Sequence, residues 1–263
     1  MVRAYGQWIA SRFAFGRSPR LRLSTNVEVV EWLSFSEYWA FSEGIPRAER
    51  LYADSSLAPG SDGGKVAVDI GANVGLFSCY LASISASLHA FEPIASTFCR
   101  LEKNMKHNSL LERATLNCLA VGEDLRIVPF SVNDLASATN RLSAGSPTER
   151  RQWVASVSLD EYSSLLGLSV IHFLKIDVEG MEPYVLKGAR SLLLRKAVKH
   201  ILIEICPVNL RSVGLSVSAL AEEIRAIPYT PFALDADGRP AHILTEDDLG
   251  AIELSNVALL PNA

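Results

Sequence analysis

The sequence predicts an α/β fold built on a mostly parallel β-sheet. From Lys65 onward, short runs of β-type residues alternate with segments of helical periodicity, which is the pattern of βαβ units. One run, HILIEI at 200–205, is almost continuously apolar, as a strand covered by helices on both faces should be. A chain of 263 residues that is 49% hydrophobic is long enough to enclose such a sheet around a core.

The predicted elements follow one another along the chain. Near the C-terminus, the pair Asp237 and Gly238 suits a hairpin turn, so antiparallel strands should extend the parallel sheet, with NVALL at 256–260 as the last strand. The predicted helix at 218–227 has Ser216 or Ser218 as its N-cap. The predicted strands before the hairpin are 65–70, 87–92, 115–121, 170–176 and 200–205, and the two earlier helices are 93–108 and 182–197.

The glycine-rich stretch at 58–64 is the clearest linker, and it divides the chain into two parts. We predict an N-terminal helical cap over 1–64 and the sheet-containing domain over 65–263. Residues 1–25 carry five arginines, interleaved with aromatic residues and without any acid. We interpret them as a solvated packing arm, with a membrane-surface segment as the alternative. Four aromatic residues are expected to form the core of the cap, with a platform for the acceptor as the alternative: Trp32, Phe35, Tyr38 and Trp39.

Composition narrows the function. A net charge of −4 and a pI near 5.8 give no basic surface for nucleic acid, so a small-molecule substrate is expected.

Without a C-x-x-C pair, the cysteines are interpreted as buried thiols rather than zinc ligands or a redox centre. No apolar run approaches the ~20 residues that span a bilayer, and no signal peptide is visible, which predicts a cytoplasmic protein. The composition leaves open whether the protein is a homo-oligomer.

A loop of small residues, DIGANVG at 69–75, follows the first predicted strand. Its glycines leave room for a ligand against the backbone at the carboxyl edge of the sheet. The dinucleotide fingerprint requires glycine where Asn73 stands, and Asp69 would repel a pyrophosphate. An acid suits the sulfonium and ammonium groups of S-adenosylmethionine (SAM), so we predict a SAM site and keep a NAD-dependent oxidoreductase as the alternative. The residues expected at the methionine half are Asp69, Gly71, Ala72, Asn73 and Gly75.

Two later positions complete the predicted nucleoside site. Glu92 ends the second strand 17 residues after Gly75, where an acid can accept hydrogen bonds from both ribose hydroxyls. Ala120 and Val121, at the end of the third strand, are expected to flank the adenine, with simple core packing as the alternative.

Several motifs give a closer identification. VSLDEY at 157–162, FLKIDVEGMEPYVLKGA at 173–189 and HILIEI closely resemble the pattern of the FkbM family of class I methyltransferases. DIGANVG, HAFEP, LDADGRP and NVALLP fit the same pattern in order, so the resemblance covers residues 65–261. It implies a Rossmann-like class I methyltransferase fold, with a mostly parallel seven-stranded sheet and an antiparallel C-terminal hairpin. It also implies SAM-dependent O-methylation of a sugar or polyketide hydroxyl; the alternatives are N-methylation of a small amine and a SAM-binding protein without activity.

Methyl transfer to a hydroxyl needs alignment and a general base. Asp177, at the carboxyl end of the fourth strand, is the predicted base, and Glu179 and Glu204 follow near the same edge. Lys175 shares a strand face with Asp177 and is expected to pair with these acids. The alternatives are a divalent cation held by Asp177, Glu179 and Glu204, which we do not favour, and a purely structural ion pair.

His172 lies early in its strand and is interpreted as structural. The polar stretch 133–140 is either a loop that closes over the ligand or an ordinary surface loop.

Overall fold

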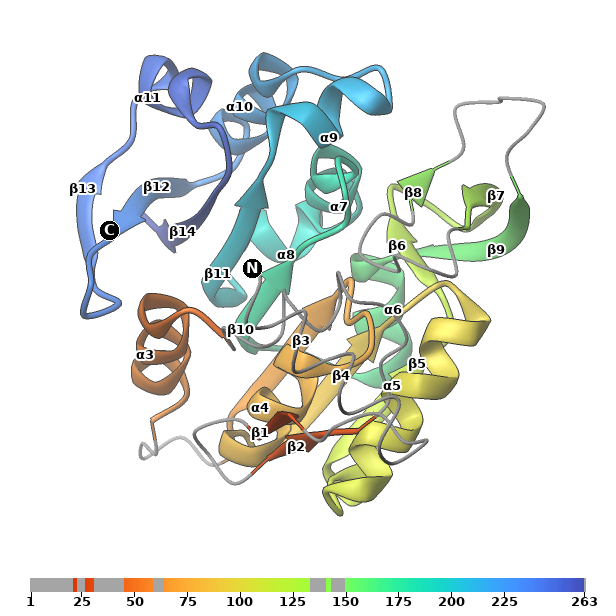
Figure 1. Cartoon of the computed structure of the whole chain (residues 1–263). Helices are drawn as coiled ribbons and strands as arrows, with labels where there is room; N and C mark the ends of the chain where they lie inside the picture. Colours follow the sequence, from red (N-terminus) through yellow and green to blue (C-terminus); the bar gives the residue numbers. More distant parts are fainter. Residues whose placement is uncertain are drawn as a thin grey trace, which may run out of the picture.

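A central eight-stranded β-sheet organises the molecule (Figure 1). The computed structural model describes residues 21–22, 27–30, 45–58, 64–132, 141–142 and 150–262. In spatial order the strands of the central sheet are β13 (Pro240–Ile243), β12 (Tyr229–Leu234), β14 (Ser255–Pro261), β11 (Val198–Ile205), β10 (Ile171–Ile176), β3 (Val66–Ile70), β4 (Ser87–Phe91) and β5 (Ala114–Asn117). The five strands β11, β10, β3, β4 and β5 are parallel to one another. The other three pair antiparallel with their neighbours: β14 with β11, β12 with β14, and β13 with β12. The sheet therefore has one strand more than the seven predicted.

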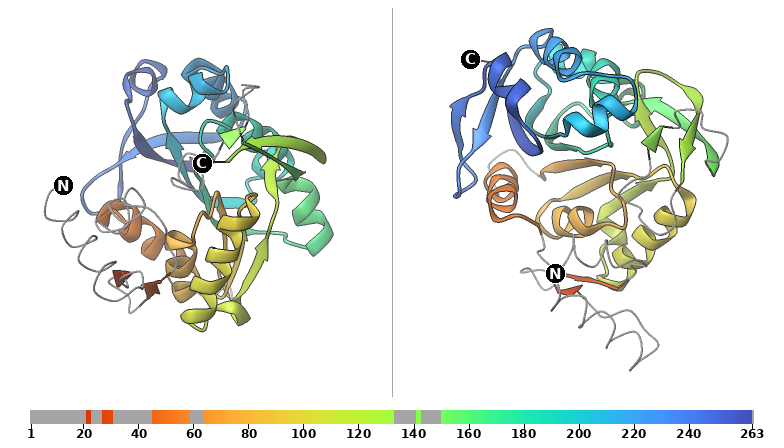
Figure 2. Two further views of the ribbon diagram at one scale, coloured as in Figure 1. Left: turned by 45° about the vertical axis from the view of Figure 1, so that its right-hand side comes forward. Right: turned by 45° about the horizontal axis from the view of Figure 1, so that its top comes forward.

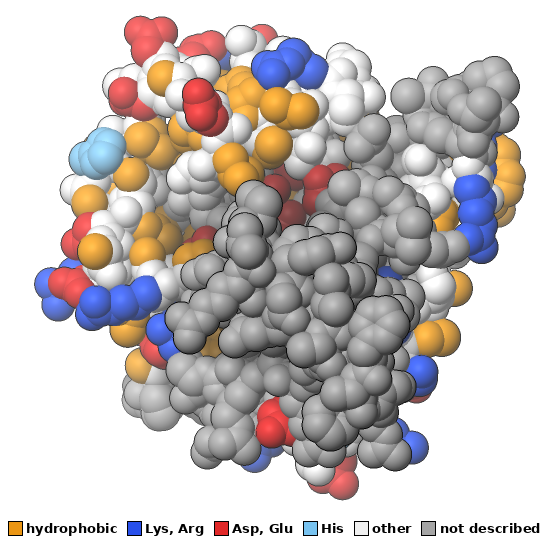
Figure 3. Space-filling model, in the orientation of Figure 1, with side chains coloured by type: hydrophobic (Ala, Val, Ile, Leu, Met, Phe, Trp, Pro, Cys, Tyr) orange, Lys and Arg blue, Asp and Glu red, His pale blue; other side chains and the backbone are white. Residues whose placement is uncertain are grey.

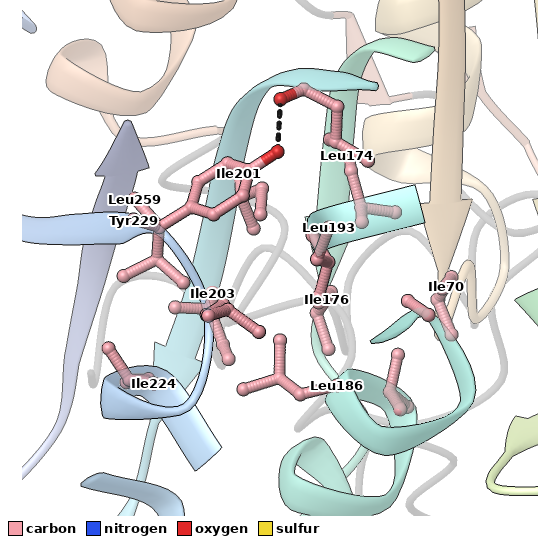
Figure 4. Close-up of a cluster of buried hydrophobic side chains, with 14 of the residues drawn as sticks. Ile70, Leu174, Ile176, Leu186, Leu193, Ile201, Ile203, Ile224, Tyr229 and Leu259 are labelled. Carbon is pink, nitrogen blue, oxygen red and sulfur yellow. Dashed lines mark hydrogen bonds between the residues drawn. The ribbon is translucent and has the colours of Figure 1, made fainter. Parts of the chain in front are cut away.

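Helices cover both faces of the central sheet (Figure 2). Side chains alternate across each strand, so Ala67 and Phe173 face one layer of helices while Val68 and Leu174 face the other. Figure 4 shows part of the second layer, in which Tyr229 donates a hydrogen bond to the carbonyl of Val198 at 2.6 Å. The first layer contains α3 (Arg47–Leu57), α4 (Leu76–Ile84) and α5 (Ala95–His107). The second contains α6 (Leu159–Leu166), α7 (Glu182–Gly188), α8 (Arg190–Leu194), α9 (Pro207–Ser212), α10 (Val217–Arg225) and α11 (Glu246–Ala251).

A second sheet of four strands lies at the side of the central sheet opposite the β12–β13 hairpin (Figure 1). This sheet was not predicted from the sequence. The predicted strand 115–121 divides between the two sheets, because the chain leaves β4 after Asn117 and pairs with a new neighbour from Ala120. The strand order in the second sheet is β6 (Ala120–Gly122), β9 (Arg151–Ser158), β7 (Arg126–Ser131) and β8 (Arg141–Leu142).

The predicted helix 182–197 is two helices in the structure, and the close contact of the first helix with the second sheet explains the break. The first, α7, ends at Gly188, which lies so close to the second sheet that a side chain there would overlap the carbonyl oxygen of Gly122. The second, α8, begins at Arg190, with the carboxylate of Asp160 accepting hydrogen bonds from the backbone N–H groups of Ser191 and Leu192. The N-cap of α10 is Ser216, whose side chain accepts from Ala219.

The described part of residues 1–64 contains one helix, α3, and two short paired strands, β1 (Leu21–Arg22) and β2 (Glu28–Val29). The helix α3 packs on the sheet, because Tyr52, Ala53 and Leu57 belong to the core shared with α4. The β12–β13 turn lies on α3, where Gly238 approaches the backbone of the helix too closely for any side chain. A cap formed by the whole segment stays a prediction, since most of the basic arm 1–25 and the whole aromatic stripe lie outside the described residues. The polar stretch 133–140 lies outside them as well.

The cysteine prediction was partly wrong. All four are free, but only Cys79 is buried, whereas Cys99 and Cys118 are exposed and Cys206 is half-buried. Cys99 lies on the solvent side of the amphipathic α5, and Cys118 lies where the predicted third strand breaks between the sheets. None of the helices in the described ranges is both long and apolar enough to span a membrane.

We expect Gly188→Ala to destabilise the fold by about 1–3 kcal/mol, because the added methyl group would push α7 away from β6. Gly250→Ala on α11 is the matched control: nothing lies within 4 Å of the methyl group that this change adds, so stability should be unchanged or slightly higher. Urea denaturation of both variants measures the difference. Equal stability of Gly188→Ala and the wild type would contradict the close α7–β6 contact.

Candidate active site

A cavity of about 350 Å³ opens at the carboxyl ends of β3, β4 and β10, between the central sheet and the second sheet. Parallel strands end at this edge, so the loops that follow them meet there. Of the twelve predicted site residues, eight line the cavity: Gly71, Asn73, Glu92, Ala120, Val121, Asp177, Glu179 and Glu204. The other four, Asp69, Ala72, Gly75 and Lys175, are not among the lining residues. Figure 3 shows acidic side chains gathered in a hollow near the centre of the face it presents.

The glycine loop is held against the neighbouring loop. Gly71 has φ of +87°, and a side chain there would overlap the carbonyl oxygen of Asp177. The backbone N–H of Asp177 donates to the carbonyl of Ile70 at 3.0 Å, so the loops after β3 and β10 are in direct contact. Gly75, at φ +90°, begins α4 and packs on Leu101. Both glycines are therefore required by the backbone itself, whatever room they also leave for a ligand.

Asp69 lies behind the cavity wall. Strand alternation turns its side chain toward α4, where Oδ2 accepts a hydrogen bond from the hydroxyl of Ser78 at 2.6 Å and Oδ1 has no partner among the described residues. The carboxyl group is fully buried, and this burial raises its pKa, while the nearby ammonium of Lys175 acts in the opposite direction. A direct contact between Asp69 and the methyl donor stays a prediction.

Glu92 joins two of the loops that form the cavity. Its carboxylate accepts hydrogen bonds from the backbone N–H groups of Asn73 at 3.1 Å and Ile94 at 2.9 Å. Burial raises the pKa of Glu92 to about 7, although both backbone donors favour the charged form. The side chain is held in one position at the cavity wall, with lone pairs left for the hydroxyls of a ligand.

One end of the cavity is apolar, and the second sheet forms much of it. Ala120 and Val121 line it from β6 of that sheet, and their contact with an adenine stays a prediction. Residues that were not predicted from the sequence complete this end: Phe91, Leu119, Val128 and Phe130. Residues 151–156 were not interpreted as a strand, because the apolar residues of β9 do not follow its burial: Trp153 is exposed, whereas Ser156 is buried.

The opposite end is lined by the acids Asp177, Glu179 and Glu204, and Lys175 contacts the first of them. Lys175 Nζ lies 2.6 Å from Asp177 Oδ2 and 5.4 Å from the centre of the Phe77 ring, with only 6% of the residue exposed. Burial alone would lower the pKa of Lys175, but the carboxylates of Asp177 and Asp69 outweigh it and raise the pKa. Lys175 and Asp177 therefore form an ion pair at the carboxyl end of β10.

Glu204 and Glu179 lie at the same end. Burial, and next the charge of Asp177, raise the pKa of Glu204 to about 9, so this carboxyl group keeps its proton at neutral pH. Glu179, at φ +55°, accepts a hydrogen bond from Asn209 at 2.6 Å. Within the described part of the chain, no three His, Cys, Asp or Glu side chains are grouped as a metal site would require.

Two further acids were not predicted. Glu49, in the first turn of α3, accepts a hydrogen bond from Asn256 at 2.7 Å, and burial raises its pKa to about 7. Glu182 accepts from the backbone of Val178 and Gly180, which fixes the loop after β10. The EGMEP motif could have indicated Glu182. Glu49 does not line the cavity, and no sequence signal indicated it, because it precedes the recognisable motifs and comes near the charges of Lys175 and Asp177 only through the fold.

His172 lies at the start of β10, at the end of the strand away from the cavity. Its Nδ1 accepts a hydrogen bond from the backbone N–H of Val66 at 3.1 Å. The side chain therefore joins two neighbouring strands, in agreement with the structural role expected for it.

Stability should depend on pH through Glu204. The pKa of Glu204 is 4.5 in the unfolded chain and about 9 in the folded protein. Between these two pH values the folded protein holds a proton on Glu204 that the unfolded chain releases, so stability falls as pH rises. Between pH 7.5 and 9 we expect the free energy of unfolding to fall by about 1–2 kcal/mol less in Glu204→Gln than in the wild type, because Gln cannot ionise. Urea denaturation at both pH values measures this, with the exposed Glu253→Gln as control. Parallel curves for Glu204→Gln and the wild type would contradict the raised pKa.

Comparison with known proteins agrees with this geometry. The family model of the methyltransferase FkbM domain matches residues 69–228, more than half of the chain. The hexuronic acid methyltransferase AglP of Haloferax volcanii is 29% identical over 138 residues, which are 52% of this chain and 54% of that protein. The crystal structure of a methyltransferase FkbM from Methylobacillus flagellatus KT has a TM-score of 0.51 at 19% identity, over 86% of this chain and 50% of that one.

The chain thus spans about half the length of each of these two proteins. At 19% identity the structural likeness concerns the fold, and it confirms the predicted class of α/β fold. The family match includes the loop after β3, Glu92, the second sheet and the acids from Asp177 to Glu204. The resemblance read from the motifs is confirmed, and the chain belongs to the FkbM methyltransferase family.

Proposed function

We propose that the protein is a SAM-dependent methyltransferase that methylates a hydroxyl group of a sugar or of a polyketide-type natural product. The observation that carries the proposal is the cavity with two different ends. A fixed carboxylate, Glu92, lies beside an apolar slot, and a Lys175–Asp177 pair lies at the other end. This arrangement suits a nucleoside at one end and a reacting hydroxyl at the other. Family membership supports the same reaction.

The residues of the cavity fit the proposed methyl donor. Glu92 offers carboxylate oxygens to the ribose hydroxyls, and Ala120 and Val121 offer a flat apolar wall to the adenine. Gly71 and Asn73 line the cavity between Glu92 and Asp177, where the methionine part would lie. The bound donor supplies an electrophilic methyl group on its sulfonium.

Asp177 is the group that we assign to proton transfer. Its Oδ2 is held by Lys175, so the carboxylate has a fixed direction, and it accepts the proton of the acceptor hydroxyl as the new C–O bond forms and the C–S bond breaks. Glu204, protonated at neutral pH, can donate a hydrogen bond to another acceptor oxygen. Alignment of this kind is worth up to about 7–11 kcal/mol, and a general base contributes about 10²–10⁴-fold.

Glu92→Ala is expected to weaken the binding of S-adenosylhomocysteine by about 10–100-fold, because two hydrogen bonds to a carboxylate are lost. Isothermal titration calorimetry measures this, and Glu102→Ala, on the exposed side of α5, should bind normally. Titration with NAD tests the alternative cofactor. Tight binding of NAD without binding of S-adenosylhomocysteine would contradict the assignment of a methyl-donor site.

Asp177→Asn is expected to lower methyl transfer by about 10²–10⁴-fold while keeping the affinity for S-adenosylhomocysteine, since the change removes the base and keeps the shape. Transfer of labelled methyl groups to a panel of glycosides, polyketide alcohols and amines gives the rate. Asp247→Asn, on the exposed surface of α11, is the matched control. Full activity of Asp177→Asn would remove Asp177 from the reaction. Loss of wild-type activity on chelation, restored by Mg²⁺, would favour the metal alternative.

A further inference from the structure

The loop that follows β10 has a backbone conformation that few side chains adopt. Glu179 has a φ angle of +55°, and Gly180 follows it at +101°. Both angles lie in the left-handed region, which residues with a side chain enter rarely. A side chain at position 180 would also overlap the backbone carbonyl of Asn209 in α9. The loop therefore lies in direct contact with α9, at the end of the cavity that Glu179 lines.

Two side chains hold this loop from different helices. Glu182, in α7, accepts hydrogen bonds from the backbone N–H groups of Val178 at 3.3 Å and Gly180 at 3.1 Å. These are the residues directly before and after Glu179. Asn209 Nδ2 donates to Glu179 Oε2 at 2.6 Å. Backbone and carboxyl group are thus both fixed, and a left-handed residue that its surroundings hold in this way is typical of a functional site.

Glu179 lines the same end of the cavity as Asp177 and is two residues away in the chain. Asp177 is the group assigned to proton transfer, so the reacting hydroxyl lies beside Asp177 and its neighbours on the acceptor come near Glu179. A carboxyl group has several acceptor positions on its two oxygens, so Glu179 can accept from a ligand while it accepts from Asn209. Asn209 is not among the lining residues and would act through Glu179.

We propose that Glu179 binds a hydroxyl next to the one that is methylated, and that Asn209 is the positioning residue that holds Glu179 for this contact. The acceptor is then a polyol such as a hexopyranoside. The inference rests on the proposed function and selects the sugar from its two acceptor classes. A sugar ring presents hydroxyls on consecutive carbon atoms, whereas a lone polyketide alcohol presents one.

The test combines changes in the enzyme with changes in the acceptor. The methyl glycosides of glucose, galactose and mannose are screened with labelled SAM, and NMR of the product locates the new methyl group. The best acceptor is then compared with its monodeoxy analogues, each of which lacks a hydroxyl on a carbon beside the methylated one. Steady-state transfer to each is measured for the wild type and three variants.

The variants separate the contact from the fold. Asn209→Ala removes the donor to Glu179. Glu179→Asn shortens the side chain and leaves α9 unchanged, and asparagine tolerates the left-handed backbone at this position. Val208→Ala is the matched control, because Val208 is the neighbour of Asn209 on α9 and is 62% exposed. Titration with S-adenosylhomocysteine shows that each variant is folded.

For the wild type we expect kcat/KM to be about tenfold lower for one deoxy analogue than for its parent, because a hydrogen bond to Glu179 is lost. In Asn209→Ala and Glu179→Asn this ratio should shrink at least threefold, chiefly through a higher KM for the parent. Val208→Ala should keep the wild-type ratio.

A purely structural role of Asn209 and Glu179 would lower transfer to the parent and to its analogues equally, and this result would overturn the inference. Equal kcat/KM of the wild type for the parent and every analogue would overturn it as well. Transfer to polyketide alcohols but to none of the glycosides would do the same and leave the proposed function standing. Transfer to no alcohol at all, with intact cofactor binding, would contradict the proposed function itself.

Discussion

The buried ammonium of Lys175 is the charge on which the carboxyl edge of the sheet depends. It stands on β10 opposite Asp69 on β3 and contacts Asp177 at the end of its own strand. Burying a carboxylate without a partner is costly, and removing one member of a buried pair typically costs about 3–5 kcal/mol. Without Lys175, Asp69 and Asp177 would each lose their nearby positive charge. One cation thus allows acids to gather on adjacent strands.

Carboxylates also set the shape of this edge. Glu92 accepts from the loops that follow β3 and β4, and Glu182 accepts from the loop that follows β10. Each carboxylate is buried and fixes backbone N–H groups that a strand or helix does not use. Gly71 then allows the β3 loop to lie directly on Asp177. The cavity is therefore built by backbone contacts before any ligand enters.

The sequence predicted the parallel strands, the segments of α5, α7, α8 and α10, and eight of the residues that line the cavity, because buried strands and small-residue loops have local signatures. It assigned Asp69 and Gly75 to the methyl-donor site, and the structure adds that Asp69 accepts a hydrogen bond from Ser78 on α4 and that Gly75 is the N-cap of that helix. It missed the second sheet, because a strand that leaves one sheet and joins another keeps the same apolar pattern. Alternation in a run of residues indicates a strand but not its partner.

What the sequence by itself determined was the fold class, the family and the identity of the acids at the strand ends, since each depends on residues close together in the chain. The tertiary structure decided which groups act on one another. Glu49 meets the charges of Lys175 and Asp177 only because α3 packs on the sheet, and the pKa of Glu204 is raised only because the fold desolvates this side chain near the charge of Asp177. Electrostatic interaction depends on the distance between groups and on their burial, and neither quantity can be obtained from the order of residues in the chain.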